Sequence, residues 1–368
     1  MKEIEKKEKV NITRRPSQTF NFDEKIGEGY FSASYFLKAK HIAEQKRSKQ
    51  WVTMQFFQKK QAILCGVDEA IALLQRFARN PEGLKIWALN DGDVISPFES
   101  VLIVEGFYED FAYLEGIIDG ILSRCTSIAT NVRETLNAAN GKPIIFMGDR
   151  NDYFTLQPTD GYAAYIGGAT MQATDAMHQY QGGTGVGTMP HSLIQLFNGN
   201  LIQACEAYMQ VYPNSPLTAL VDYNNDVITD SLKVAKHFGE KLYAVRVDTS
   251  ANMVDRYFLT HQETFGQEDL RGVNVPLIKQ LRHQLDQAGF PWVKIVVSGG
   301  FNQQKVQHFE QQNAPVDYYG IGASLLKISI DFTGDCVRLN GKAQAKAGRR
   351  YRVNPRLSTV HFYHVFLM

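Results

Sequence analysis

A glycine-rich segment that ends in a histidine is the part of this sequence best suited to chemistry. Residues 182–187 read Gly-Gly-Thr-Gly-Val-Gly, and Thr188 and two further residues lead to His191, which opens a helix-like run. Glycines let backbone N–H groups approach an anion closely, and a helix N-terminus adds partial positive charge. A histidine placed there can accept a phosphoryl group, transfer a proton or cap the helix. The glycine spacing matches neither the dinucleotide-binding nor the P-loop pattern.

Two more glycine clusters each follow an apolar run. Ser298, Gly299 and Gly300 come directly after residues 293–297, and Gly320 and Gly322 come after residues 316–319. In α/β barrels the loops after the last two strands often bind phosphate through backbone N–H groups and a short helix N-terminus. The order of the two clusters therefore predicts a phosphate site, with tight barrel corners as the structural alternative.

Two aspartates end other apolar runs. Asp222 follows residues 217–221, and Asp248 follows residues 242–247 with Arg246 and Thr249 beside it. Carboxylates at strand ends can bind a ribose diol, hold Mg²⁺ or stabilise positive charge on a sugar in the transition state. Each aspartate can instead cap the helix that follows it. The polar neighbours favour a functional role for Asp248, whereas both interpretations stay open for Asp222.

One arginine has a similar position. Arg150 follows the apolar residues 144–147 and can hold a carboxylate or a phosphate with two N–H groups. An isolated arginine also commonly forms a surface ion pair, so its place after a strand is the reason to favour binding. The remaining histidines lack metal-ligand spacing, and we expect no metal site built from protein side chains.

The elements that must position these residues alternate between strand-like and helix-like stretches. Residues 51–57 and 101–106 have strand patterns, and residues 30–49, 68–77 and 111–136 have helical ones. Later in the chain, short β-rich runs end in polar or glycine residues and lead into helix-like segments, which is typical of an α/β barrel. An open, doubly wound sheet is the alternative.

We therefore predict an α/β fold with two domains. A barrel spans residues 111–330, and a mixed N-terminal α/β domain spans residues 1–110. The tail, residues 331–368, begins with a hairpin-like stretch at Cys336–Lys342 and is expected to complete the N-terminal domain.

Composition excludes several classes of protein. The chain has 368 residues, 44% of them hydrophobic, so it can bury a large core, and its net charge of +1 disfavours a general nucleic-acid binder. Its four cysteines are far apart, which indicates reduced thiols rather than disulfides or a zinc cluster. No apolar run is long enough to span a membrane, and no secretory signal is evident. We expect a cytoplasmic enzyme that acts on small molecules.

The motifs, taken together, resemble those of nicotinate phosphoribosyltransferases, a family of type II phosphoribosyltransferases. The resemblance runs from about Phe20 to the tail, and it depends on the order of the motifs because no single one is specific. The motifs are Glu115-Gly116-Ile117-Ile118, Thr126-Ser127-Ile128-Ala129-Thr130, Gly187–His191, Leu220–Asp222, Val245–Thr249, Val297–Phe301 and Gly320–Leu325.

The resemblance implies an irregular, incomplete TIM-like α/β barrel packed on the N-terminal α/β domain. It also implies an enzyme of NAD biosynthesis. Such enzymes join nicotinate to phosphoribosyl pyrophosphate, giving nicotinate mononucleotide and pyrophosphate, with Mg²⁺ and coupled hydrolysis of ATP. They usually work as homodimers with sites at the subunit interface. No nucleic acid or membrane partner is implied.

The same resemblance assigns roles to residues of this chain. His191 matches the histidine that ATP phosphorylates, Asp248 lies near the ribose, Arg246 near the phosphates and Arg150 near the nicotinate carboxylate. Tyr35 falls where an N-terminal aromatic side chain reaches the pyridine ring, and the two glycine clusters match the 5′-phosphate site. The expected site is completed by Asp222, Thr188 and Thr249.

Some positions depart from the family pattern. Ser32-Ala33-Ser34 precedes Tyr35 where many relatives have Thr-Asp, and residues 222–226 replace the common Asp-Thr-Tyr-Asp segment. The tail holds only Cys336, so we expect no structural zinc. Two alternatives stay open: a related transferase that uses quinolinate or nicotinamide, and a catalytically silent nucleotide-binding relative. Retention of His191, Asp248 and both glycine clusters argues against the silent relative.

Overall fold

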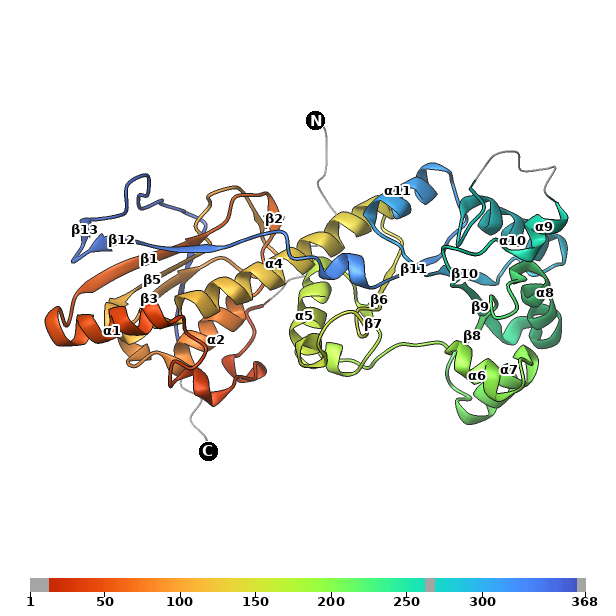
Figure 1. Ribbon diagram of the computed structural model, residues 1–368, viewed down its shortest axis with the longest axis horizontal. Coiled ribbons are helices and arrows are strands. Elements are labelled where there is room, and N and C mark those ends of the chain that lie inside the picture. Colours follow the sequence, from red (N-terminus) through yellow and green to blue (C-terminus); the bar gives the residue numbers. More distant parts are fainter. Residues whose placement is uncertain (1–12, 262–268, 363–368) are drawn as a thin grey trace. The chain divides into compact units, whose positions relative to one another are not determined.

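The computed structural model describes residues 13–261 and 269–362, and these divide into two compact units (Figure 1). Unit 1 holds the described residues of Met1–Thr130, Tyr162–Gly167 and Lys327–Met368, and unit 2 holds Asn131–Gly161 and Gly168–Leu326. Two helices, α4 (Glu115–Ala138) and α5 (Gln157–Gly167), continue across the division. The predicted limits of the two domains, at residues 110 and 330, remain a prediction.

Unit 1 is built on a six-stranded sheet in which every pair of neighbours is antiparallel. Strand β1 (Trp51–Phe57) lies in the middle of this sheet. Its side chains point alternately to two covered faces, so six of its seven residues are buried. A separate two-stranded ribbon pairs β2 (Ala62–Ile63) with β4 (Val94–Ile95). The order of the large sheet is β13 (Lys342–Ala343), β12 (Thr333–Leu339), β1 (Trp51–Phe57), β5 (Leu102–Phe107), β3 (Lys85–Ala88) and β14 (Ser358–Val360).

Helices α1 (Ser34–Lys46), α2 (Val67–Phe77), α3 (Tyr108–Phe111) and the part of α4 up to Thr130 belong to unit 1. Apolar residues of α2 and α4 share one core with β1, β3 and β5, and nine of the eleven residues of α2 are buried. Helix α1 has no buried residue. The predicted helix at 111–136 is in fact α3, a 3₁₀ turn at Ala112–Leu114 and then α4.

The C-terminal tail completes the sheet of unit 1, as predicted. Strand β12 pairs with β1, and β14 pairs with β3. Basic side chains of the tail have partners in unit 1, which favours the interpretation that they fix the tail over binding of nucleic acid. Arg349 pairs with Asp335 at 2.7 Å, Arg356 pairs with Glu99 at 2.8 Å, and Arg338 stacks on Tyr351.

Three carboxyl groups meet where α4 begins beside β12. Burial, followed by the charges of Asp119 and Asp335, raises the pKa of Glu115 to about 8. Burial also raises the pKa of Asp119 to about 6, although the Gly334 N–H donates to it. A carboxyl group whose pKa is raised by folding holds its proton longer in the folded than in the unfolded chain. The contribution of Glu115 to the free energy of unfolding is therefore fully present below about pH 4.5, and it is lost as the pH rises toward 8.

Replacing Glu115 with glutamine should remove this pH dependence. At pH 8 we expect the free energy of unfolding of the variant to be roughly 2 kcal/mol higher than that of wild type. This value is reduced because the Glu115 side chain is partly exposed to solvent. At pH 4.5 the two proteins should be nearly equal. Denaturant unfolding at both pH values measures the difference, and Glu240→Gln at an exposed site is the control. Equal stabilisation at both pH values would contradict the titration of Glu115.

Unit 2 is an incomplete α/β barrel. All neighbouring strands in its six-stranded sheet are parallel. The first strand, β6 (Ile144–Phe146), pairs with the last, β11 (Tyr318–Ile321), as in a closed ring. The ring is open between β7 (Met171–Gln172) and β8 (Leu217–Leu220). Strands β10 (Lys294–Val297) and β9 (Leu242–Val247) lie between β11 and β8. The barrel prediction is confirmed and the doubly wound alternative is wrong.

Helices follow the strands of unit 2, as the alternating pattern predicts. Inside the barrel, Ile145, Ala244 and Val296 form a small buried cluster. None of the helices in the described ranges is long and apolar enough to span a bilayer. The remaining helices are α6 (His191–Leu196), α7 (Leu201–Val211), α8 (Val227–Phe238), α9 (Arg256–Thr260), α10 (Val275–Gln287) and α11 (Gln303–Gln311).

Candidate active site

Most of the predicted site residues lie at or just beyond the carboxyl ends of the strands of unit 2. Asp222 follows β8, Asp248 follows β9 and Ser298 follows β10. Because the strands are parallel, their carboxyl ends lie at the same edge of the sheet. This common edge explains how Asp248 and Ser298, which are 50 positions apart in the chain, reach one another.

Arg246 is the centre of a hydrogen-bonded network at this edge. Its Nη1 donates to Thr188 Oγ1 at 3.0 Å, its Nη2 to Asp248 Oδ2 at 2.9 Å and its Nε to Ser298 Oγ at 3.2 Å. Asp248 Oδ1 accepts a second bond, from Ser298 Oγ at 2.8 Å. The structure thus brings together four residues that were predicted separately.

The network leaves both charged groups accessible. The Arg246 side chain is 16% exposed and the Asp248 side chain 24%, so a ligand can reach them without rearrangement of the fold. A guanidinium fixed by three bonds presents a rigid cation to phosphate oxygens. A carboxylate held beside it can stabilise positive charge on a neighbouring carbon.

His191 forms a second pair, with Asp222. His191 is the first residue of α6, and its Nε2 lies 3.0 Å from Asp222 Oδ2. Burial raises the pKa of Asp222, and the charge and hydrogen bond of His191 act in the opposite direction. The histidine ring is 44% exposed, whereas the aspartate side chain is 6% exposed. Asp222 therefore orients the histidine and does not cap the following helix, whose N-cap residue is Asp226.

This pair assigns the two ring nitrogens different roles. An anionic Asp222 accepts the Nε2–H, which leaves the lone pair on Nδ1. Nδ1 is then the nucleophilic or basic atom of His191. Asp222 Oδ1 has no partner among the described residues, so this buried oxygen can accept a ligand proton or contribute to a cation site.

The first phosphate cluster has the backbone that an anion cradle needs. Gly299 and Gly300 have φ values of 88° and 69°, which favour glycine. A Cβ at Gly299 would lie 3.2 Å from Asp248 Oδ1, whereas a Cβ at Gly300 would meet nothing within 4 Å. Helix α11 follows, and Asn302 caps it. The loop therefore combines open space, free backbone and a helix N-terminus.

The second cluster is more closely packed. Gly320 lies inside β11 and not in the loop after it, and a Cβ there would come 2.9 Å from Met147. A Cβ at Gly322 would lie 2.5 Å from the Met147 carbonyl oxygen. Close packing is thus sufficient to explain why both positions are glycine, and a phosphate role for them stays a prediction.

The other predicted residues form none of the hydrogen bonds of the Arg246 network. Arg150 is exposed in the turn after β6 and forms no ion pair with a described residue, so the surface ion-pair alternative lacks a partner. Thr249 is 3% exposed, and its Oγ1 has no partner among the described residues. Tyr35 belongs to unit 1, where its ring is 65% exposed at the start of α1.

Two residues that sequence reasoning missed support the glycine-rich segment. Asp175 accepts a hydrogen bond from the Gly185 N–H at 2.7 Å, and His178 Nδ1 lies 3.3 Å from the Gly182 carbonyl oxygen. A Cβ at Gly183 would lie 2.7 Å from the same nitrogen, so the buried His178 ring fixes the start of this segment. No local pattern signals either role, because both contacts depend on how an irregular loop folds.

A cavity of about 280 Å³ lies within the barrel beside Thr188. Its walls include apolar interior residues such as Ile145, Met171 and Val296, and the paired hydroxyls of Tyr243 and Tyr318. A cavity with an apolar wall and a few polar groups suits a planar aromatic ring.

Metal binding by the protein alone is not favoured. The described residues contain no group of three or more His, Cys, Asp or Glu side chains arranged to hold a metal ion. Mg²⁺ in phosphate chemistry is usually held by one or two carboxylates together with substrate phosphates. The unpartnered Oδ1 of Asp222 fits such a shared site.

Comparisons with known proteins agree with this fold. Residues 33–126 match the model of the quinolinate phosphoribosyl transferase N-terminal domain. Nicotinate-nucleotide pyrophosphorylase from Pyrococcus furiosus superposes with a TM-score of 0.77 at 28% identity, covering 93% of this chain and 85% of that one. Human nicotinic acid phosphoribosyltransferase superposes at 0.66 with 18% identity, covering 87% and 77%, and supports the fold alone.

Curated relatives point the same way. Nicotinate phosphoribosyltransferase pncB1 of Mycobacterium tuberculosis is 27% identical over 241 residues, which are 64% of this chain and 48% of that protein. The Bacillus subtilis nicotinate phosphoribosyltransferase is 20% identical over 244 residues, covering 65% and 45%. The chain thus spans about half the length of these relatives.

Fold and comparisons agree on a class: the chain is similar in sequence and fold to type II phosphoribosyltransferases. Its curated relatives within that class are nicotinate phosphoribosyltransferases, and the resemblance seen in the sequence motifs is confirmed.

Proposed function

We propose that the chain is a nicotinate phosphoribosyltransferase that joins nicotinate to phosphoribosyl pyrophosphate. The observation that carries the proposal is the network of Arg246 with Thr188, Asp248 and Ser298 at the carboxyl ends of the barrel strands. It places a fixed cation, a carboxylate and a phosphate-type glycine loop together. A phosphoribosyl group needs these same three functions.

In this proposal the side chains act on a ribosyl carbon that gains positive charge. The pyridine nitrogen is a modest nucleophile, so the bond to pyrophosphate must weaken before the new C–N bond is strong. Asp248 stabilises the positive charge on the sugar, and Arg246 binds phosphate oxygens. The loop at Ser298–Gly300 holds the 5′-phosphate through its N–H groups. Asp222 would hold Mg²⁺ through Oδ1 together with the pyrophosphate, and the ion would supply positive charge for the leaving group.

We assign the ATP-dependent step to His191. Its Nδ1 attacks the γ-phosphorus of ATP, the bond to the bridging oxygen breaks and ADP leaves. Asp222 stabilises the ring through the Nε2–H during this transfer. The phosphohistidine carries about two negative charges by analogy with other phosphoresidues. That charge lies beside the proposed pyrophosphate site and favours release of the product, after which water removes the phosphoryl group.

We place the nicotinate ring in the barrel cavity beside Thr188, and Arg150 near its carboxylate. Replacing Arg150 with lysine should raise KM for nicotinate about tenfold, because lysine cannot make a two-point contact. KM for phosphoribosyl pyrophosphate should stay near the wild-type value. Steady-state kinetics with each substrate varied in turn tests this, with Arg47→Lys at an exposed site as control. An equal rise in both KM values would move Arg150 to the phosphate side.

The homodimer, in which Tyr35 of one subunit reaches the ring bound by the other, is part of the proposal. The exposed ring of Tyr35 on a helix without buried residues supports it. Sedimentation at equilibrium measures the oligomeric state directly.

The experiment that tests the function offers one base at a time. Purified protein is incubated with phosphoribosyl pyrophosphate, Mg²⁺ and nicotinate, nicotinamide or quinolinate, each with and without ATP, and the mononucleotide is measured by mass spectrometry. We expect nicotinate mononucleotide, with more of it when ATP is present. Product from quinolinate or nicotinamide instead would identify the related transferase. No product from any base would favour the silent relative.

A further inference from the structure

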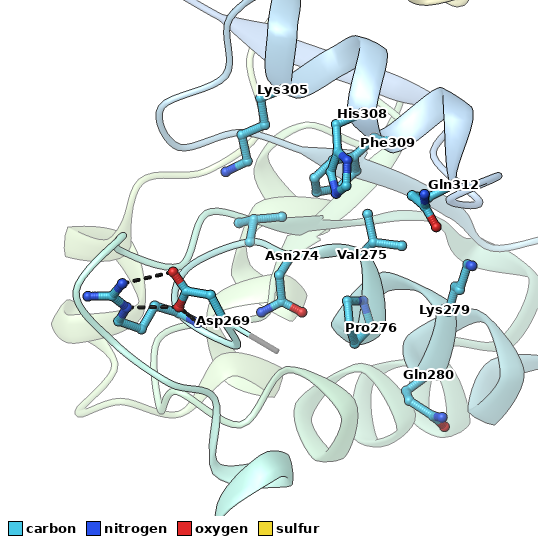
Figure 2. A pocket seen from close by; sticks show the side chains of 12 residues that line it. Asp269, Asn274, Val275, Pro276, Lys279, Gln280, Lys305, His308, Phe309 and Gln312 are labelled. Atoms are coloured by element: carbon cyan, nitrogen blue, oxygen red, sulfur yellow. Dashed lines mark hydrogen bonds and ion pairs between the residues drawn. The ribbon is translucent and has the colours of Figure 1, made fainter. Parts of the chain in front are cut away.

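A cavity of about 700 Å³ lies between α10 and α11, outside the Arg246 network (Figure 2). Its walls come from the loop before α10, the start of α10 and one side of α11. The floor is apolar, since Val273, Val275 and Phe309 are 2%, 7% and 2% exposed. The volume is within the usual range for small-molecule sites, and the apolar floor suits a ring or another flat group.

The rim of this groove is positively charged. Lys279 of α10 and Lys305 of α11 both line it, and neither forms an ion pair with a described residue. The one acidic lining residue, Asp269, is occupied by Arg271 through two contacts of 2.8 Å. Within the described lining of the groove, no free carboxylate therefore balances the two lysines.

Lys305 is the more informative of the two lysines. Its Nζ lies 4.3 Å from the centre of the Phe301 ring and 3.5 Å from the Gly299 carbonyl oxygen. Figure 2 shows the side chain reaching from α11 toward the loop that carries Asp269. Burial lowers the pKa of Lys305, because it removes the ammonium group from water. A half-buried ammonium without a counter-ion is costly, and an anionic ligand would relieve that cost.

The start of α10 adds a second attraction for anions. Asn274, Val275 and Pro276 line the groove, and Asn274 caps this helix of 13 residues by accepting from the Leu277 N–H at 2.9 Å. The partial positive charge of the helix N-terminus therefore acts on the same space as Lys305.

We propose that this groove binds a phosphate ester with an attached ring, which is the chemistry of a nucleotide. The phosphate lies between Lys305 and the N-terminus of α10, and the ring covers the apolar floor beside His308. None of the residues that line the groove is assigned to phosphoribosyl transfer, although Lys305 also contacts Gly299 of the phosphate loop, so the proposal does not require that reaction.

Calorimetric titration of the whole chain tests the proposal. The probes are AMP, ATP, nicotinate mononucleotide and inorganic phosphate, each titrated separately. We expect at least one nucleotide to bind more tightly than inorganic phosphate, because only nucleotides cover the floor. Lys305→Met should weaken that binding about tenfold, and Lys305→Arg should restore most of it. Lys236→Met, which removes an exposed lysine of α8, is the matched control and should have no effect.

A second variant separates the groove from the phosphate loop. Ser298→Ala removes a hydroxyl of the loop and leaves every groove residue in place. Binding that survives in Ser298→Ala and is lost in Lys305→Met supports the groove, as does a shift of the His308 ring signals in the NMR spectrum. Equal weakening by both variants, loss in Lys236→Met, or no nucleotide binding by wild type would overturn the proposal.

Discussion

Replacing Asp248 with asparagine is expected to lower kcat/KM for phosphoribosyl pyrophosphate about 10²–10³-fold. Asp248 uses one oxygen for Arg246 and the other for Ser298, so it holds two further groups in position. Asparagine keeps the size of the side chain, but it removes the negative charge and turns an NH₂ group toward one of those donors. The charge that stabilises the ribosyl carbon and the orientation of Arg246 are lost together.

A matched control separates this effect from a loss of folding. Asp286 also pairs with an arginine, Arg282 at 2.7 Å, but its side chain is 49% exposed at the end of α10. We expect Asp286→Asn to retain wild-type kinetics and both variants to keep the wild-type far-UV circular dichroism spectrum. Wild-type kcat/KM in Asp248→Asn would remove this carboxylate from the proposed mechanism.

The strand ends could be predicted from sequence because the barrel makes them regular. A buried parallel strand has a short apolar run, and the first polar residue after it marks the edge where chemistry is possible. Asp222, Asp248 and Ser298 were each found in this way, and the structure places all three just past a strand. The same rule did not separate Gly320 from its strand, because glycine has no polar side chain to mark the boundary.

The pairing between these ends could not be predicted from the residues alone. That Arg246 bonds to Thr188 across 58 positions depends on how the irregular segment 182–190 crosses the barrel edge. The contacts of His178 and Asp175 with this segment span only four and ten positions, but no periodic pattern predicts them because they depend on the fold of an irregular loop. Strand β7 has only two residues, too few to show a pattern of its own.

The helix after β5 shows a different limit. Apolar spacing over residues 111–136 predicts one helix, yet α3 ends at Phe111 and a 3₁₀ turn precedes α4. Phe111, Ala112, Tyr113 and Leu114 are all buried, so packing determines the backbone there. Periodicity reports which face is buried and does not record a change in helix type.

The second large effect is expected at His191. His191→Asn should abolish the stimulation by ATP, while slow transfer without ATP stays within about threefold of the wild-type rate. Asparagine is polar and can keep a hydrogen bond to Asp222, but it has no nitrogen that accepts a phosphoryl group. Product formation with and without ATP measures this, together with acid-labile phosphate on the protein after incubation with ATP alone.

His237 supplies the control, because it too pairs with a carboxylate, Glu206 at 2.8 Å. That pair is exposed on both sides, at 45% and 44%, whereas the carboxylate beside His191 is 6% exposed. A buried partner holds the ring in one orientation and keeps the Nδ1 lone pair available, and an exposed partner does not. His237→Asn should therefore retain full ATP stimulation and full protein phosphorylation. If His191→Asn still responded to ATP like wild type, the phosphoryl acceptor would be another residue, and the role of the His191–Asp222 pair would be limited to orientation of the glycine-rich segment.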